Sequence, residues 1–173
     1  MPVRLPRRIS ACFFDMDGVL TRTAEIHAAA WKQMFDEYLS RRATQEDGRF
    51  VPFDEVNDYD RFVDGRPRLD GTREFLRSRG IELPLGSTSD PPGTETLYGL
   101  SNRKNELVQR SIADKGVAVY PGSVRFLREV RRRSLATAVV SSSANTVEVL
   151  RAAGLEGTFD VMIDGVVAEL EHL

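Results

Sequence analysis

Residues 11–18 read Ala-Cys-Phe-Phe-Asp-Met-Asp-Gly, a short apolar run that ends in a polar turn. An apolar run bounded by a turn predicts a buried strand of a parallel sheet, covered on both faces. Open α/β sheets place their sites at the carboxyl ends of such strands. Because residues two apart point the same way in an extended segment, we expect Asp15 and Asp17 to project together into one crevice.

The elements expected after this turn fall into two groups. Apolar residues at helical spacing predict helices over 23–39, 70–80 and 101–115, with polar or Pro- and Gly-rich stretches between them. No convincing strand occurs between residues 24 and 115. Strands are predicted at 135–140 and 159–163, and each is preceded by a predicted helix. The first helix carries Val124, Leu127 and Val130, and the second carries Val147, Leu150 and Ala153.

This order predicts an α/β fold, a Rossmann-like doubly wound parallel sheet built from right-handed βαβ units. We assign residues 1–23 and 116–173 to the α/β core. Residues 24–115 are then an inserted helical domain.

Composition excludes several classes of protein. The formal net charge is −2 over 173 residues, and the basic runs are not interleaved with aromatic residues, so we expect no nucleic-acid partner. The single cysteine, Cys12, rules out a disulfide framework and a thiolate zinc site. No apolar stretch approaches the roughly 20 residues needed to span a bilayer, and the apolar run after the basic start is too short for a signal peptide. We therefore expect a cytoplasmic, monomeric protein without a membrane partner.

Two polar turns follow predicted strands and are candidate sites. Carboxylates as close as Asp15 and Asp17 repel, which favours a shared proton or a bound divalent cation, and Gly18 lets a ligand approach the backbone. An ordinary acidic turn is the alternative for an isolated Asp-x-Asp-Gly. For the second turn, Ser141-Ser-Ser-Ala-Asn145, the alternative is a flexible connection in which Asn145 caps the next helix.

The stretch Phe13–Thr21 resembles the first motif of the haloacid dehalogenase-like phosphotransferases, hhhDxDGxhh[T/S]. Val139-Val-Ser141 resembles their second motif, and the helical insertion resembles their subclass I cap. Within this superfamily the chain is similar to the β-phosphoglucomutase group. That similarity rests on Asp15-Met-Asp-Gly-Val-Leu-Thr-Arg-Thr-Ala-Glu-Ile-His27, Val63-Asp-Gly-Arg-Pro-Arg68, Asn102-Arg-Lys-Asn105, Tyr120-Pro-Gly122 and Ser141-Ser-Ser-Ala-Asn145.

The resemblance implies a role for each matching residue. Asp15 would be the nucleophile that forms an aspartyl-phosphate, and Asp17 the general acid and base. Mg²⁺ would bind to Asp15 and to the backbone carbonyl of Asp17. His27 would couple cap closure to Asp17. The implied phosphate- and substrate-binding residues are Gly18, Gly65, Arg68, Lys104, Ser141, Ser142, Ser143 and Asn145.

The cap residues also have ordinary structural explanations. A single histidine on a helix, such as His27, is usually a surface or core residue, and the charges of Arg68 and Lys104 could lie on a solvated cap surface.

The implied reaction interconverts β-glucose 1-phosphate and glucose 6-phosphate through a bisphosphate. A sugar-phosphate phosphatase, in which water attacks the aspartyl-phosphate, is the alternative within the superfamily. A truncated, non-catalytic phosphosugar-binding or vestigial protein is the alternative from another class.

That last alternative rests on the third motif, whose lysine has no counterpart because no lysine follows Lys115. Asp160 and Asp164 precede the expected position of that motif, and we interpret them as strand-end residues. We therefore expect a core that is truncated before its third motif.

Overall fold

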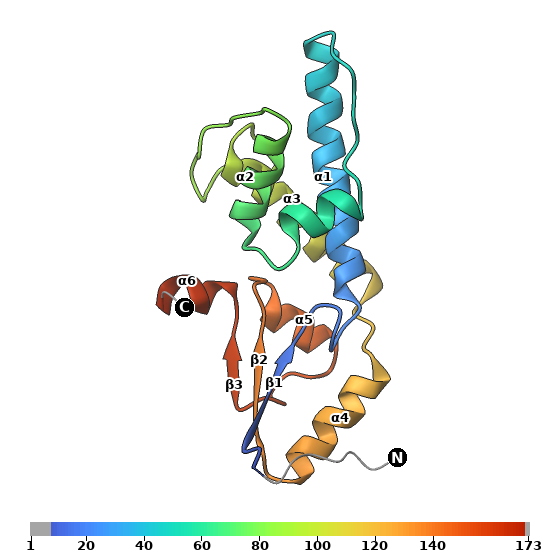
Figure 1. Cartoon of the computed structure of the whole chain (residues 1–173), viewed down its shortest axis with the longest axis vertical. Coiled ribbons are helices and arrows are strands. Elements are labelled where there is room, and N and C mark those ends of the chain that lie inside the picture. The colour runs from blue at the N-terminus through green and yellow to red at the C-terminus, as the bar shows by residue number, and fades with distance from the viewer. Residues whose placement is uncertain (1–7, 172–173) are drawn as a thin grey trace. The chain divides into compact units, whose positions relative to one another are not determined.

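The computed structural model describes residues 8–171, which divide into two compact units (Figure 1). One unit comprises the described residues up to Ala24 together with those from Lys115 onward. The other is the continuous segment Glu25–Asp114.

The first unit is built on a three-stranded parallel sheet in the order β1-β2-β3. Its strands are β1 (Ala11–Asp15), β2 (Ala136–Val140) and β3 (Val161–Ile163). Asp15 pairs in register with Val140, and Val140 with Ile163, so the three carboxyl ends meet at one edge. The helices of this unit are α4 (Pro121–Arg132), α5 (Thr146–Ala152) and α6 (Gly165–Glu171). The predicted α/β class is confirmed.

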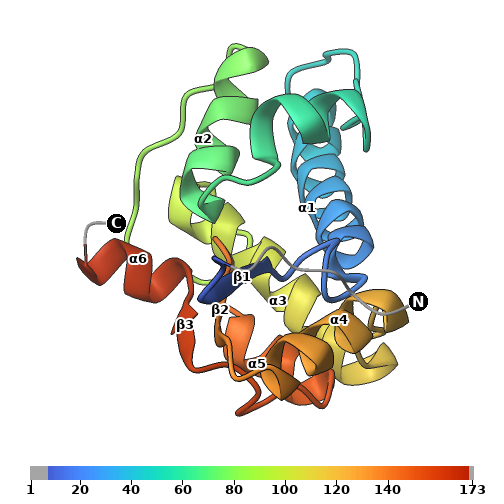
Figure 2. The same ribbon diagram turned by 60° about the horizontal axis from the view of Figure 1, so that its bottom comes forward.

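Successive side chains of β1 point to opposite faces of the sheet, and the face that carries Phe14 packs against the core. Phe14 is buried, and its ring centroid lies 5.8 Å from those of Phe126 on α4 and Phe159. The apolar stripe of α4 is buried, consistent with its spacing of three residues: Val124, Leu127 and Val130. Helices α4 and α5 lie on the same side of the sheet (Figure 2).

The other face of the sheet is open in the described part of the chain. Phe13 is 79% exposed, and Val140 and Val161, which share its face by register, are 42% and 53% exposed. The expectation of a strand covered on both faces was therefore wrong for residues 8–171. An apolar run shows that each side chain favours burial, but both predicted crossover helices cover the face of Phe14.

The second unit is helical: α1 (Thr23–Gln45, which begins at the unit boundary), the π-helical turn η1 (Tyr59–Val63), α2 (Arg68–Ser78) and α3 (Leu97–Lys115). Its core is an aromatic cluster in which the ring of Phe35 lies 5.2 Å from Phe53 and 4.1 Å from Phe75, measured between centroids. Helix α1 continues six residues beyond the predicted end, and α3 begins four residues before the predicted start. None of the described helices is both long enough and apolar enough to cross a membrane.

Helix α6 was not predicted. Asp164 stands before it, and its Oδ1 accepts hydrogen bonds from the backbone N–H groups of Val166 (3.0 Å) and Val167 (2.8 Å). Asp164 is thus a strand-end residue that also caps a helix.

Candidate active site

The first candidate turn reverses the chain directly after β1. Asp15 is exposed at the end of the strand, and its Oδ1 accepts a hydrogen bond of 2.8 Å from the backbone N–H of Met16. The carbonyl of Met16 then accepts from the backbone N–H groups of Leu20 and Thr21, each at 3.0 Å. Gly18 has φ +79°, a left-handed conformation that favours glycine at this position.

Both carboxylate oxygens of Asp17 accept hydrogen bonds from hydroxyls. The Thr23 hydroxyl donates to Oδ1, and Ser141 Oγ lies 3.1 Å from Oδ2. Thr23 is itself 2.7 Å from the Thr21 hydroxyl. Hydrogen bonds to an ionised carboxylate are among the stronger ones. They fix the Asp17 side chain between the loop after β1 and the loop after β2.

The loop after β2 is held by its own side chains. Ser141 Oγ accepts from the backbone N–H of Ser143 at 3.1 Å, and Ser143 Oγ accepts from that of Asn145 at 3.2 Å. Asn145 occupies the N-cap position of α5 but makes no side-chain capping hydrogen bond. Ser142 is exposed. Asn145 thus stands at the N-cap position that the alternative expects, but without the capping hydrogen bond.

The start of α6 packs directly against the same loop. A Cβ atom added at Gly165 would lie 2.4 Å from the carbonyl oxygen of Ser142, closer than any side chain tolerates. The backbone N–H of Gly165 donates to the Ser143 carbonyl at 3.2 Å. A glycine is therefore required where the third strand turns into α6.

The helical unit brings three of its predicted residues into one neighbourhood. Lys104 on α3 is 5% exposed, and its Nζ lies 2.8 Å from Nδ1 of His27 on α1. Burial of the ring, followed by the charges of Lys104 and Arg68, holds the pKa of His27 well below its usual value. Burial also lowers the pKa of Arg68. For Lys104, the alternative of a solvated surface residue is wrong.

Gly65 lies in the exposed turn between η1 and α2, three residues before Arg68. It has φ +66°, and a Cβ atom there would contact nothing within 4 Å. The backbone conformation, rather than crowding, is the reason a glycine suits this turn.

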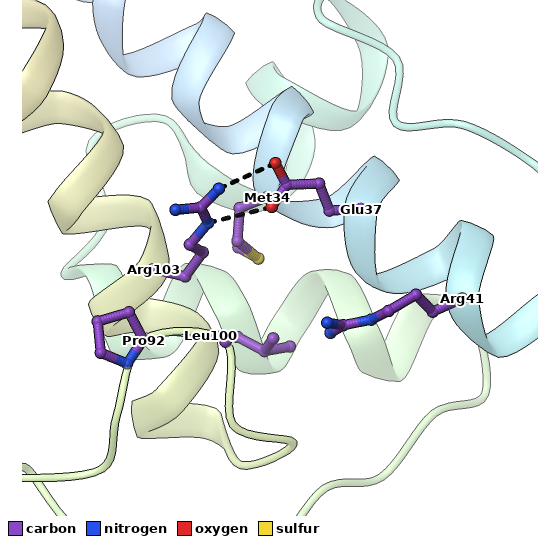
Figure 3. Close-up of a pocket in the computed structure, with 7 residues that line it drawn as sticks. Met34, Glu37, Arg41, Pro92, Leu100 and Arg103 are labelled. Atoms are coloured by element: carbon purple, nitrogen blue, oxygen red, sulfur yellow. Dashed lines mark hydrogen bonds and ion pairs between the residues drawn. The ribbon is translucent and has the colours of Figure 1, made fainter.

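A pocket of about 250 Å³ in the helical unit contains none of the predicted site residues (Figure 3). Arg103 Nε and Nη2 each lie 3.1 Å from a carboxylate oxygen of Glu37. The paired hydrogen bonds lower the pKa of Glu37 and raise that of Arg103. The pocket is lined by Met34, Glu37, Arg41, Pro92, Gly93, Leu100 and Arg103.

The sequence did not identify three residues that contact the predicted site residues. Thr23 was expected only as the first residue of the helix over 23–39, yet its hydroxyl donates a hydrogen bond to Asp17. Trp31, whose ring centroid lies 4.9 Å from Lys104 Nζ, carried no signal beyond its place one helical turn after His27. Gly165 gave no signal because its partner is a backbone carbonyl in another loop.

Comparisons with known proteins identify the family and the fold of the chain. A family model for haloacid dehalogenase-like hydrolases matches residues 9–171. The chain is 50% identical over 169 residues to a β-phosphoglucomutase of Mycobacterium bovis, covering 98% of this chain and 64% of that protein. It is 29% identical over 156 residues to a β-phosphoglucomutase of Bacillus subtilis, covering 90% and 61%.

A crystal structure of β-phosphoglucomutase from Clostridium difficile has the same fold, with a TM-score of 0.68, 22% identity, and coverage of 91% of this chain and 62% of that one. The chain thus spans less than two thirds of the length of these relatives. Since the family model matches nearly every described residue, the chain belongs to the haloacid dehalogenase-like hydrolases.

Proposed function

We propose that this protein transfers a phosphoryl group on a sugar phosphate through an aspartyl-phosphate at Asp15, and that its reaction converts β-glucose 1-phosphate to glucose 6-phosphate. The observation that carries the proposal is the Asp17 carboxylate, held by two hydroxyls in the turn that follows the exposed carboxylate of Asp15. The 50% identity to a mycobacterial β-phosphoglucomutase supports this choice of reaction.

In the first half-reaction, a carboxylate oxygen of Asp15 attacks phosphorus, and the bond between phosphorus and the sugar oxygen breaks. Asp17 donates its proton to that leaving oxygen. In the second half-reaction, Asp17 takes the proton of the accepting hydroxyl, whose oxygen attacks phosphorus and releases Asp15. Thr23 and Ser141 keep the Asp17 carboxylate in one orientation through both steps. In a mutase the acceptor is a sugar hydroxyl, whereas in a phosphatase it is water.

The donors in this turn fit Mg²⁺. Among residues 8–171, no three Asp, Glu, His or Cys side chains gather as a metal site would require on its own. Mg²⁺ commonly takes only one or two carboxylates and completes its shell with phosphate oxygens and water, so Asp15 and the backbone carbonyl of Asp17 are the donors that residues 8–171 would offer it. An ion held there would offset the charge between Asp15 and an incoming phosphate.

We assign the cap residues to the substrate's second phosphate and its sugar. Lys104 and Arg68 supply positive charge, and His27, whose lowered pKa keeps it neutral near pH 7, accepts a hydrogen bond from Lys104. A mutase must hold two phosphates and exclude water, so a cationic cap favours the mutase over the phosphatase. Gly18, Gly65, Ser141, Ser142, Ser143 and Asn145 are the remaining proposed phosphate- and substrate-binding residues.

A parallel assay of glucose 6-phosphate and inorganic phosphate tests the proposal, with β-glucose 1-phosphate, a trace of the bisphosphate and Mg²⁺ supplied. We expect glucose 6-phosphate to form, and Asp15→Asn to abolish its formation. Release of phosphate without glucose 6-phosphate would favour the phosphatase. Binding of the sugar phosphate without either product would favour a non-catalytic protein.

A further inference from the structure

The ammonium of Lys104 is held by two groups that carry no negative charge. Lys104 is 5% exposed, yet its Nζ lies 2.8 Å from His27 Nδ1 and 4.9 Å from the centroid of the Trp31 ring. An aromatic face attracts a cation, and the attraction is greatest where water is excluded. A neutral imidazole and an indole therefore both stabilise the buried ammonium of Lys104.

The Trp31 ring is fixed by contacts on its other sides. Trp31 is 3% exposed and stacks on Phe35, with ring centroids 5.3 Å apart and planes 12° apart. A Cβ atom at Gly71 on α2 would lie 3.3 Å from Cζ2 of Trp31, so α2 approaches the ring edge at a residue without a side chain. Because His27 and Trp31 are one turn apart on α1, both present their rings to Lys104.

A buried hydrogen bond joins α2, which carries Arg68, to α3, which carries Lys104. The Thr72 hydroxyl on α2 donates to the Arg68 carbonyl at 3.0 Å and lies 2.9 Å from the Ser101 hydroxyl on α3. Ser101 precedes Lys104 by about one turn. The backbone positions of Arg68 and Lys104 are therefore set by packing, whereas the orientation of the long lysine side chain depends on the groups around its ammonium.

We propose that Trp31 is the positioning residue that orients the Lys104 side chain, so that its ammonium is presented to a phosphate of the substrate. The proposal rests on the sugar-phosphate function proposed above. Removing the indole takes away one of the contacts that orient the ammonium, and substrate binding then has to restrict the lysine side chain further. The loss should appear in substrate affinity and should depend on the presence of Lys104.

A double-mutant cycle read by calorimetry tests this dependence. We expect Trp31→Leu to weaken binding of β-glucose 1-phosphate roughly tenfold and Trp31→Phe, which keeps an aromatic face, to restore most of it. In the Lys104→Ala background, adding Trp31→Leu should weaken substrate binding little further, because the lysine that Trp31 positions is already absent. Equal losses in the presence and absence of Lys104 would overturn the proposal, since a purely structural tryptophan gives additive effects.

Fluorescence provides a readout that does not depend on the function. Trp31 is the single tryptophan of the chain, so indole emission reports this site alone. We expect Lys104→Met to change the emission of Trp31, and Lys115→Met, at the exposed end of the same helix, to leave it unchanged. Unchanged emission in Lys104→Met would overturn the placement of the ammonium on the ring. If wild type does not bind β-glucose 1-phosphate, the proposed function fails, and the emission still decides this placement.

Discussion

The orientation of the Asp17 carboxylate depends on two hydroxyls from distant parts of the chain. Ser141 is 124 residues away in sequence, and no spacing rule connects it to Asp17. What could be predicted is that both residues follow strands of one parallel sheet, whose carboxyl ends meet. The direct bond between them follows from side-chain rotamers, which the residue pattern does not specify.

Thr23 offers a test at this scale. Thr23→Val keeps the branched shape but removes the hydroxyl, and we expect kcat to fall about 10- to 100-fold, since a hydrogen bond to a charged group contributes about 1.5–3 kcal/mol. KM should change little. Thr23→Ser, which keeps the hydroxyl, should retain most activity, and urea unfolding should show both variants folded. Wild-type kcat in Thr23→Val would contradict the role of this hydroxyl.

His27 should make stability depend on pH. Its pKa in the folded chain lies well below the ordinary value of 6.5, because of burial and then the charges of Lys104 and Arg68. Below pH 6.5 the unfolded chain therefore binds a proton that the folded chain does not. By linkage, the free energy of unfolding should fall as the pH drops below 6.5 towards the folded pKa.

His27→Asn checks this sign, because the amide can accept a hydrogen bond from Lys104 but does not titrate. Urea unfolding between about pH 5 and pH 7.5 should show a smaller pH dependence for the variant than for wild type. The pKa of Glu37 is lowered from 4.5 by its hydrogen bonds with Arg103, so this carboxylate stays ionised in the folded chain over this range. His172→Asn, outside the described residues, is the matched control. The same slope in His27→Asn and wild type would contradict the prediction.

At the scale of elements, the spacing of apolar residues predicted each helix that has an apolar stripe facing a core. It misplaced helix ends where the residues form no such stripe. Helix α4 was found from Val124, Leu127 and Val130, all buried. The last turns of α1, residues 40–45, hold mostly polar residues and gave no such signal. Gly99 lies in the first turn of α3, before the predicted start, and its backbone approaches Thr94, whose carbonyl oxygen would be 2.4 Å from an added Cβ.

The junction of β3 and α6 provides the test at this scale. Gly165→Ala places a methyl group against the Ser142 carbonyl, and overpacking against backbone should cost on the order of 1–3 kcal/mol of unfolding free energy. Because the loop from Ser141 to Ser143 must shift, activity should fall as well. Gly122→Ala in the first turn of α4 is the matched control, since its Cβ would meet only Arg125 at 3.9 Å. Equal stability of the two variants would contradict the close contact.

At the scale of the whole molecule, the sheet is covered on one face only within residues 8–171, and the chain spans less than two thirds of the length of its β-phosphoglucomutase relatives. The predicted truncation of the core stays a prediction. The apolar run of β1 could not show that one face is open, because the same residues suit a strand covered on both sides.

The open face should bind apolar dyes. Phe13 is 79% exposed beside Val140 and Val161, and contiguous exposed apolar surface is uncommon on monomeric proteins. We expect the 173-residue chain to enhance anilinonaphthalene sulfonate fluorescence, and Phe13→Thr to lower the enhancement by roughly half, because Phe13 is the largest and most exposed of the three. Phe50→Thr, which removes a ring 41% exposed in the helical unit, is the control and should leave it unchanged.

Stability separates this outcome from partial unfolding, which also raises dye fluorescence. Phe13 loses little buried area on substitution, so Phe13→Thr should unfold at the same urea concentration as wild type. Phe14, on the opposite face and only 5% exposed, should by contrast lose about 3–5 kcal/mol when replaced by alanine. If Phe13→Thr were as destabilising as Phe14→Ala, the face of Phe13 would be packed in solution. Dye binding that is unchanged in a stable Phe13→Thr would place the apolar surface elsewhere.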